Sequence, residues 1–351
     1  MLKGSVTSAG GSEQAASAHR YRAAGAAVAR IARFTVARYD THHLLYAVMF
    51  VAAVEGTAAV VSHPDSAWRP GWATAVRILV VAVLLLYLRM LDEIKDLDYD
   101  RVHNPDRPLV TGTVGVGELW VAMGVIAVAL TVVSSLLSWW SAALVVAAMG
   151  YGLALWGLES VSARIRGDLL LNLAVTYPVQ VWIIAYLVRS ASDTGQVESG
   201  WRTVWVALIF AGAFLHFEFA RKTVADVRAG QWYYSNVLGV RGSVVAIVGF
   251  AALAVGAEVV LSRPWEHPLP WALLPWVPVG LLILPALAAG SFLTRTSVSP
   301  SPPEPVRAGP ASPGESGGEP DSSTRAYPVV PAVVFVLVLY LILIVTAVTW
   351  R

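Results

Sequence analysis

Nine stretches of about 20 predominantly apolar residues run through this 351-residue chain, and they constrain its fold more than any other feature. A helix needs about that length to cross a hydrocarbon core of about 30 Å. Helices are favoured because the stretches are continuously apolar, whereas the strands of a membrane barrel would alternate over about 10 residues. The stretches lie near residues 42–62, 72–91, 117–136, 138–157, 168–188, 204–220, 240–261, 270–293 and 327–350. We therefore expect an all-α, multi-pass membrane protein with about nine transmembrane helices.

The composition excludes several other classes. Hydrophobic residues make up 56% of the chain and charged residues 14%, which is too little charge for the surface of an ordinary soluble globule. Lys and Arg number 25 against 23 Asp and Glu, so the charge balance gives no reason to propose a nucleic acid as partner. The chain has no cysteine, which excludes disulfides, thiolate metal sites and cysteine nucleophiles.

The basic residues predict an orientation, because cytoplasmic loops of membrane proteins are enriched in Lys and Arg. Nine spans place 19 of the 25 basic residues on the side of the N-terminal arm. We expect the protein to lie in the cell membrane, with that side in the cytoplasm and the C-terminus on the outer side.

Four segments are expected along the chain. Residues 1–38 predict a disordered N-terminus followed by a basic interfacial helix, with five arginines between residues 20 and 38. Residues 39–295 predict a bundle of eight helices. Residues 296–326, rich in Pro, Ser and Gly, predict a flexible linker, and residues 327–351 predict a ninth transmembrane helix tethered loosely to the other eight.

Four carboxylates gather at the end of the second apolar stretch. On an ideal helix Asp92, Glu93, Asp96 and Asp100 fall within about 100° of one another, whereas Asp98 falls on the opposite side at about 240°. Carboxylates held together on one face repel one another, so their grouping implies a compensating cation. All-oxygen ligands of high charge density select a hard divalent ion such as Mg²⁺, which accepts phosphate oxygens as its remaining ligands.

A solvated acidic helix end, with Lys95 and Arg101 as local partners, is the alternative explanation of this segment. Ionisable groups that all face one way at the end of a span favour the functional explanation.

A second polar segment follows the sixth apolar stretch. Glu218, Lys222 and Asp226 recur at four-residue steps and lie within about 80° of one another on an ideal helix. Two such faces at the cytoplasmic ends of two spans suggest a duplicated bundle with one site between its halves. A Glu–Lys pair that supports a juxtamembrane helix explains the second segment equally well.

The first segment resembles the signature of the UbiA superfamily of intramembrane prenyltransferases, which reads Asn-Asp-x-x-Asp-x-x-x-Asp and is followed by an Arg-Pro-Leu and Ser/Thr-Gly element. Here the pattern runs from Asp92 to Asp100, then through Arg107-Pro108-Leu109 to Thr111-Gly112. The second segment is similar to the family's Asp-x-x-x-Asp-x-x-x-Gly run, with Asp226 and Gly230 in their places.

This resemblance implies an all-helical fold around a central cavity, in which Mg²⁺ held by both acidic motifs binds an isoprenyl diphosphate. The catalytic residues would be Asp92, Glu93, Asp96, Asp100 and Asp226, with Glu218 as a further metal ligand. Arg107, Lys222 and Arg101 would bind the diphosphate. The implied function is transfer of the prenyl group to an acceptor, with terpene cyclisation as the alternative inside the family. A lipid-binding or transport protein without catalysis is the alternative from another class.

Two departures from the family pattern bear on this interpretation. Asp92 stands where the family usually has Asn, and Lys222 stands where the second motif has its first Asp. An ammonium at Lys222 either replaces part of a second metal ion by pairing with the diphosphate or marks a lost metal site. The retained acidic face favours the first explanation.

Three further polar residues lie in or next to apolar stretches. Glu55 is expected to be buried and to face protein, because an ionisable side chain in mid-span avoids lipid. Asp168 and Asn172 share a helical face, and a capping or interhelical hydrogen-bonding role is expected for them.

Overall fold

The structure is a computed structural model that describes residues 8–39, 41–63, 65–226, 232–267, 271–297 and 326–349. Nine helices of the described part are long and apolar enough to cross a membrane, and each coincides with a predicted stretch. The chain is therefore a multi-pass membrane protein, and the all-α prediction is confirmed. The predicted linker over residues 296–326 lies almost entirely outside the described residues.

The chain divides into two compact units, which are described separately. The first unit comprises residues 1–48 and 76–157, and the second comprises residues 49–75 and 158–351. Helices α2, α3 and α6 contribute to both units. The helices from the N-terminus to α6 are α1 (Ser8–Arg38), α2 (Thr41–Ser62), α3 (Trp72–Lys95), α4 (Leu97–His103), α5 (Val116–Ser135) and α6 (Trp139–Val161). The remaining helices are α7 (Ala163–Gly167), α8 (Leu169–Thr176), α9 (Pro178–Asp193), α10 (Trp201–Arg221), α11 (Tyr234–Ser262), η1 (Pro264–Glu266), η2 (Trp271–Trp276), α12 (Val277–Leu281), α13 (Ile283–Ser297) and α14 (Val329–Thr349).

In the first unit, small residues and ion pairs hold the helices together. Gly152 of α6 lets the backbone approach α3, since a Cβ there would lie 3.0 Å from the Leu88 side chain. The N-terminal helix α1 is joined to α5 through Arg30, whose Nε donates to both carboxylate oxygens of Glu118 at 3.0 and 3.1 Å. Helix α1 begins at Ser8, whereas the basic segment that predicts a helix begins at Arg20.

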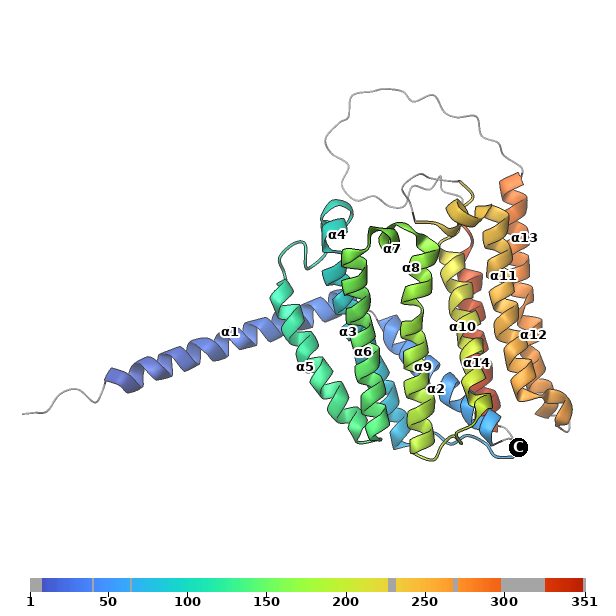
Figure 1. Cartoon of the computed structure of the whole chain (residues 1–351), viewed down its shortest axis with the longest axis horizontal. Helices are drawn as coiled ribbons and strands as arrows, with labels where there is room; N and C mark the ends of the chain where they lie inside the picture. Colours follow the sequence, from blue (N-terminus) through green and yellow to red (C-terminus); the bar gives the residue numbers. More distant parts are fainter. Residues whose placement is uncertain are drawn as a thin grey trace, which may run out of the picture. The chain divides into compact units, whose positions relative to one another are not determined.

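In the second unit, α10 and α11 pack against each other over a long contact (Figure 1). Gly212 explains this approach, because a Cβ at that position would lie only 2.6 Å from both the Ala254 nitrogen and the Phe250 carbonyl oxygen. Gly239, with φ of 70°, interrupts the regular helix near the N-terminal end of α11. The predicted span began one residue later, at residue 240.

Helix α14 is packed firmly within the second unit, which corrects the expectation of a loosely tethered ninth span. Tyr340 lies against Phe50 and Phe210, with ring centroids 6.2 and 5.4 Å away. The Trp68 backbone N–H donates to the Ala347 carbonyl at 2.8 Å. Burial of large side chains such as Phe335 and Tyr340 stabilises the attachment of this helix.

Candidate functional site

The acidic segment keeps its helical alignment across the junction between α3 and α4. The backbone N–H of Asp96 donates to the Asp92 carbonyl at 2.9 Å, and that of Asp100 donates to the Asp96 carbonyl at 2.8 Å. These i to i−4 bonds place the three aspartates one turn apart on one face, as the spacing predicts. Asp98 lies off this face with its side chain 94% exposed, and it pairs with Arg101 at 2.8 Å.

Glu93 is the most deeply buried carboxylate of the first segment, with a side chain only 1% exposed. Its Oε1 accepts from Arg38 Nε at 2.7 Å and from Arg89 Nη2 at 2.8 Å, and Arg107 Nη1 lies 3.7 Å away. Its Oε2 is buried and has no hydrogen-bond partner among the described residues. Three guanidinium groups therefore converge on one oxygen and leave the other unpaired.

Asp100 is engaged by the loop that follows α4. Its Oδ2 accepts from Arg107 Nη1, and its Oδ1 accepts from Asn104 Nδ2 at 2.9 Å. The Thr111 N–H donates to the Arg107 carbonyl at 2.9 Å, and Gly112 has a φ of 74°, which favours glycine at this turn. The Arg-Pro-Leu element thus folds back and places its guanidinium between Glu93 and Asp100.

Asp96 lies between these two arginine-bound carboxylates. It makes no side-chain hydrogen bond or ion pair with another described residue. Burial, assisted by the neighbouring Asp92 and Asp100, raises the pKa of Asp96 to about 6, against the opposing effect of Lys95 and Arg107.

A metal ion is compatible with the donor chemistry of this segment. The Asp96 carboxylate and the orphaned Oε2 of Glu93 are hard oxygen donors, which suit Mg²⁺. Among the described residues, no three His, Asp or Glu side chains stand ready at coordinating positions. Asp92, half exposed and 3.6 Å from Lys95, is the further carboxylate available on the same face.

The second polar segment, in the other unit, centres on Glu218. This buried carboxylate accepts from Arg221 Nε at 2.5 Å, pairs with Lys222 Nζ at 2.8 Å and accepts from the Tyr234 hydroxyl at 3.4 Å. Glu218 and Lys222 thus form the ion pair of the alternative explanation. Phe219 stacks on Tyr234 at 4.0 Å and holds that tyrosine in place.

The structure corrects the predicted helical face at Asp226. Helix α10 ends at Arg221, Lys222 adopts a non-helical conformation, and its carbonyl accepts from the Tyr234 N–H at 2.8 Å. The chain turns there, so Asp226 is an exposed loop residue and does not continue the face of Glu218. Gly230 lies outside the described residues.

Two solved structures share this arrangement of helices. A UbiA homologue from Aeropyrum pernix K1 matches 86% of this chain and 97% of its own, with a TM-score of 0.55 and 16% sequence identity. A digeranylgeranylglyceryl phosphate synthase matches 88% of this chain and 97% of its own, with a TM-score of 0.52 and 12% identity. The chain has a UbiA-type fold. No protein-family model and no curated protein sequence matches it.

Two arginines that bind Glu93 in this UbiA-type fold are not identified by the sequence patterns. Arg38 was assigned to an interfacial helix, yet it binds Glu93 across 55 positions of sequence. Arg89 also binds Glu93, and only its four-residue spacing from that carboxylate could have indicated the pair.

The capping and hydrogen-bonding roles expected for Asp168 and Asn172 are confirmed. Asp168 caps α8 by accepting from the Leu170 and Leu171 N–H groups, both at 3.0 Å. Asn172 donates to Glu159 at 3.1 Å, an interhelical bond.

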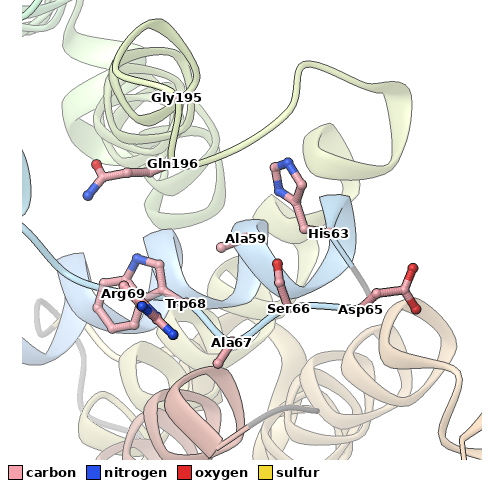
Figure 2. Close-up of a pocket in the computed structure, with 9 residues that line it drawn as sticks. All are labelled: Ala59, His63, Asp65, Ser66, Ala67, Trp68, Arg69, Gly195 and Gln196. Atoms are coloured by element: carbon pink, nitrogen blue, oxygen red, sulfur yellow. The ribbon is translucent and has the colours of Figure 1, made fainter.

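A hollow of about 640 Å³ lies in the second unit, between the segment that follows α2 and the segment that follows α9 (Figure 2). Its lining includes His63, residues 65–69 and Gln196, and Trp68 forms part of its wall. The Trp68 indole N–H donates to Glu55 at 3.0 Å, so the buried Glu55 fixes this wall and faces protein, as expected.

Proposed function

We propose that this protein is a membrane prenyltransferase of the UbiA superfamily, which ionises an isoprenyl diphosphate with Mg²⁺ and transfers the prenyl group to an acceptor. One observation carries the proposal: in a UbiA-type fold, a line of aspartates at a helix end lies beside a guanidinium held by Glu93 and Asp100. One structural neighbour is named as a digeranylgeranylglyceryl phosphate synthase, which supports an isoprenoid substrate class.

The first segment supplies the ligands in this proposal. Asp92, Asp96 and Oε2 of Glu93 would hold Mg²⁺, because Asp92 is half exposed and Oε2 of Glu93 has no hydrogen-bond partner among the described residues. When bound there, Mg²⁺ would supply positive charge that makes the diphosphate a better leaving group. Asp100 was predicted as a further ligand, but both its oxygens are engaged, so we assign it the orientation of Arg107.

Arg107 binds the diphosphate, because a planar guanidinium suits phosphate oxygens. Arg101, exposed and paired with Asp98, is proposed as a second cation for the same group. The roles predicted for Glu218, Lys222 and Asp226, which belong to the second unit, stay predictions.

The reaction breaks the allylic carbon–oxygen bond, and the bonding electron pair leaves with the diphosphate. The resulting allylic cation is captured by a nucleophilic atom of the acceptor, which afterwards releases a proton. Cations placed beforehand at the leaving group stabilise the charge that develops there. The membrane-embedded apolar helices exclude the water that would otherwise capture the cation. We propose that this site opens to the cytoplasm, as the distribution of basic residues predicts.

The test is incubation of the purified protein with geranyl, farnesyl and geranylgeranyl diphosphates, with and without Mg²⁺ and with membrane lipid extract as acceptor. We expect Mg²⁺-dependent release of diphosphate. Asp96→Ala should abolish release, whereas the matched variant Asp98→Ala, on the opposite side of the same helix, should retain most of it.

The outcomes separate the alternatives. Equal losses in both variants would contradict the assignment of the acidic face. Formation of terpene hydrocarbon or alcohol without an acceptor would identify a cyclase. A protein that releases no diphosphate and binds none of the three substrates in a Mg²⁺-dependent way would be one without prenyl chemistry.

A further inference from the structure

A buried carboxyl group outside the proposed active site lines a small cavity in the second unit. Glu258 of α11 is 3% exposed, and its Oε2 has no hydrogen-bond partner among the described residues. Thr57 of α2 and Thr346 of α14 are 7% and 4% exposed, and their hydroxyl oxygens are unpartnered in the same sense. All three side chains line one cavity of about 20 Å³.

Three unpaired oxygens around one void require an occupant, because buried polar groups in native proteins are nearly always satisfied. A volume of that size exceeds the roughly 10–15 Å³ that one water-sized particle needs. It is too small for a hydrated divalent ion or an organic molecule. The remaining lining consists of Val60, Val61, Leu261, Ser262 and Leu343.

The charge of the site favours a cation. Glu258 is the one ionisable group among the described residues that line the cavity, and a carboxylate buried without a counter-charge is costly. The Arg202 guanidinium donates to the Leu261 carbonyl at 2.7 Å and lines a separate hollow with Arg263. Arg263 is paired with Glu266 at 3.2 Å, and neither arginine lines the cavity.

The helix ends add to this preference. Glu258, Thr57 and Thr346 each lie within the last two turns of their helices, which end at Ser262, Ser62 and Thr349 respectively. The C-terminal end of a helix carries a partial negative charge and free carbonyl oxygens. Membrane proteins use such ends, together with side-chain oxygens, to coordinate Na⁺.

We propose that this cavity is a binding site for one unhydrated Na⁺ ion, with Glu258 as its charged ligand and Thr57 and Thr346 as hydroxyl ligands. A monovalent ion matches the single carboxylate charge. The ion joins α2, α11 and α14, and so contributes to the attachment of the last helix within the second unit. The proposal does not depend on the prenyltransferase assignment.

The test measures the thermal unfolding midpoint of the purified full-length protein in detergent at pH 8, in NaCl or in choline chloride at equal ionic strength. We expect the midpoint to rise saturably with Na⁺ and to stay constant in choline, because a ligand that binds only the folded state stabilises it. Equilibrium binding of radioactive ²²Na⁺ should saturate at one ion per chain. Equal midpoints in the two salts would overturn the proposal and assign the cavity to a water molecule beside a protonated Glu258.

Two variants and a matched control sharpen the test. Glu258→Gln keeps the shape of the side chain and should lose both the Na⁺ response and the bound ²²Na⁺. Glu266→Gln, a nearby glutamate outside the cavity, should respond as the wild type does. Thr346→Val removes one ligand oxygen without a change of volume and should raise the half-saturating Na⁺ concentration about tenfold. An unchanged Na⁺ response in Glu258→Gln, or an unchanged affinity in Thr346→Val, would contradict the assigned ligands.

Discussion

Replacement of Glu93 by glutamine tests whether this carboxylate organises the proposed active site. The substitution preserves the shape of the side chain and removes the negative charge on which Arg38 and Arg89 converge. A hydrogen bond to an ionised group contributes about 1.5–3 kcal/mol, and one between neutral groups about 0.5–1.5 kcal/mol. The difference is about 1–1.5 kcal/mol per bond, so the bonds from Arg38 and Arg89 together lose about 2–3 kcal/mol. Arg107, 3.7 Å from the same oxygen, loses part of its compensating charge as well.

The expected total is about 3 kcal/mol, at the lower end of the roughly 3–5 kcal/mol measured when one partner of a buried pair is removed. The lower end applies because the Arg38 and Arg89 side chains are 21% and 27% exposed, so water replaces some of the lost interaction. The assay is equilibrium unfolding by sodium dodecyl sulfate in dodecyl maltoside micelles, followed by circular dichroism. Asp98→Asn, which changes an exposed carboxylate of the same segment, is the control and should unfold as the wild type does.

A double-mutant cycle with Arg38→Gln isolates the pair. If the two side chains stabilise each other directly, the double variant should be more stable than the sum of the single losses predicts, by about 1.5 kcal/mol. A Glu93→Gln protein that unfolds at the wild-type detergent fraction, or strictly additive losses, would refute the argument that Glu93 anchors the arginines.

Three further predictions concern single positions. Gly212→Ala should lower the free energy of unfolding by about 1–3 kcal/mol in the same assay, because its Cβ would lie 2.6 Å from backbone atoms of α11, whereas Gly249→Ala meets nothing within 4 Å and should not. Burial raises the pKa of Asp96 to about 6 from an ordinary 3.8, so between these values the folded metal-free protein holds a proton that the unfolded chain has lost. The free energy of unfolding should therefore fall as the pH rises from about 4 to about 6. Asp96→Asn should remove this pH dependence. Trp68→Phe should cost about 1–3 kcal/mol of unfolding free energy, because the wholly buried Glu55 loses an N–H donor at 3.0 Å, and a loss below 0.5 kcal/mol would contradict a structural role for that bond.

The local features of this protein followed from the sequence. The nine spans could be predicted because apolar length is a property of consecutive residues, and the bilayer sets the required length. The alignment of Asp92, Asp96 and Asp100 and the exposure of Asp98 followed from helical periodicity alone. The same periodicity failed at Asp226, because Lys222 ends the helix through a bond to Tyr234, a residue beyond the turn.

Partners distant in sequence were decided by the tertiary structure. No local pattern pairs Arg38 with Glu93, nor does the composition of α14 indicate that Tyr340 packs against Phe50 and Phe210. The cavity around Glu258 is likewise formed by three helices from separate parts of the chain. Sequence fixes helical length and the face on which a side chain lies, since both depend on neighbouring residues. The packing of the helices determines which charges compensate one another and which buried oxygens have no hydrogen-bond partner. Only the folded chain sets that packing.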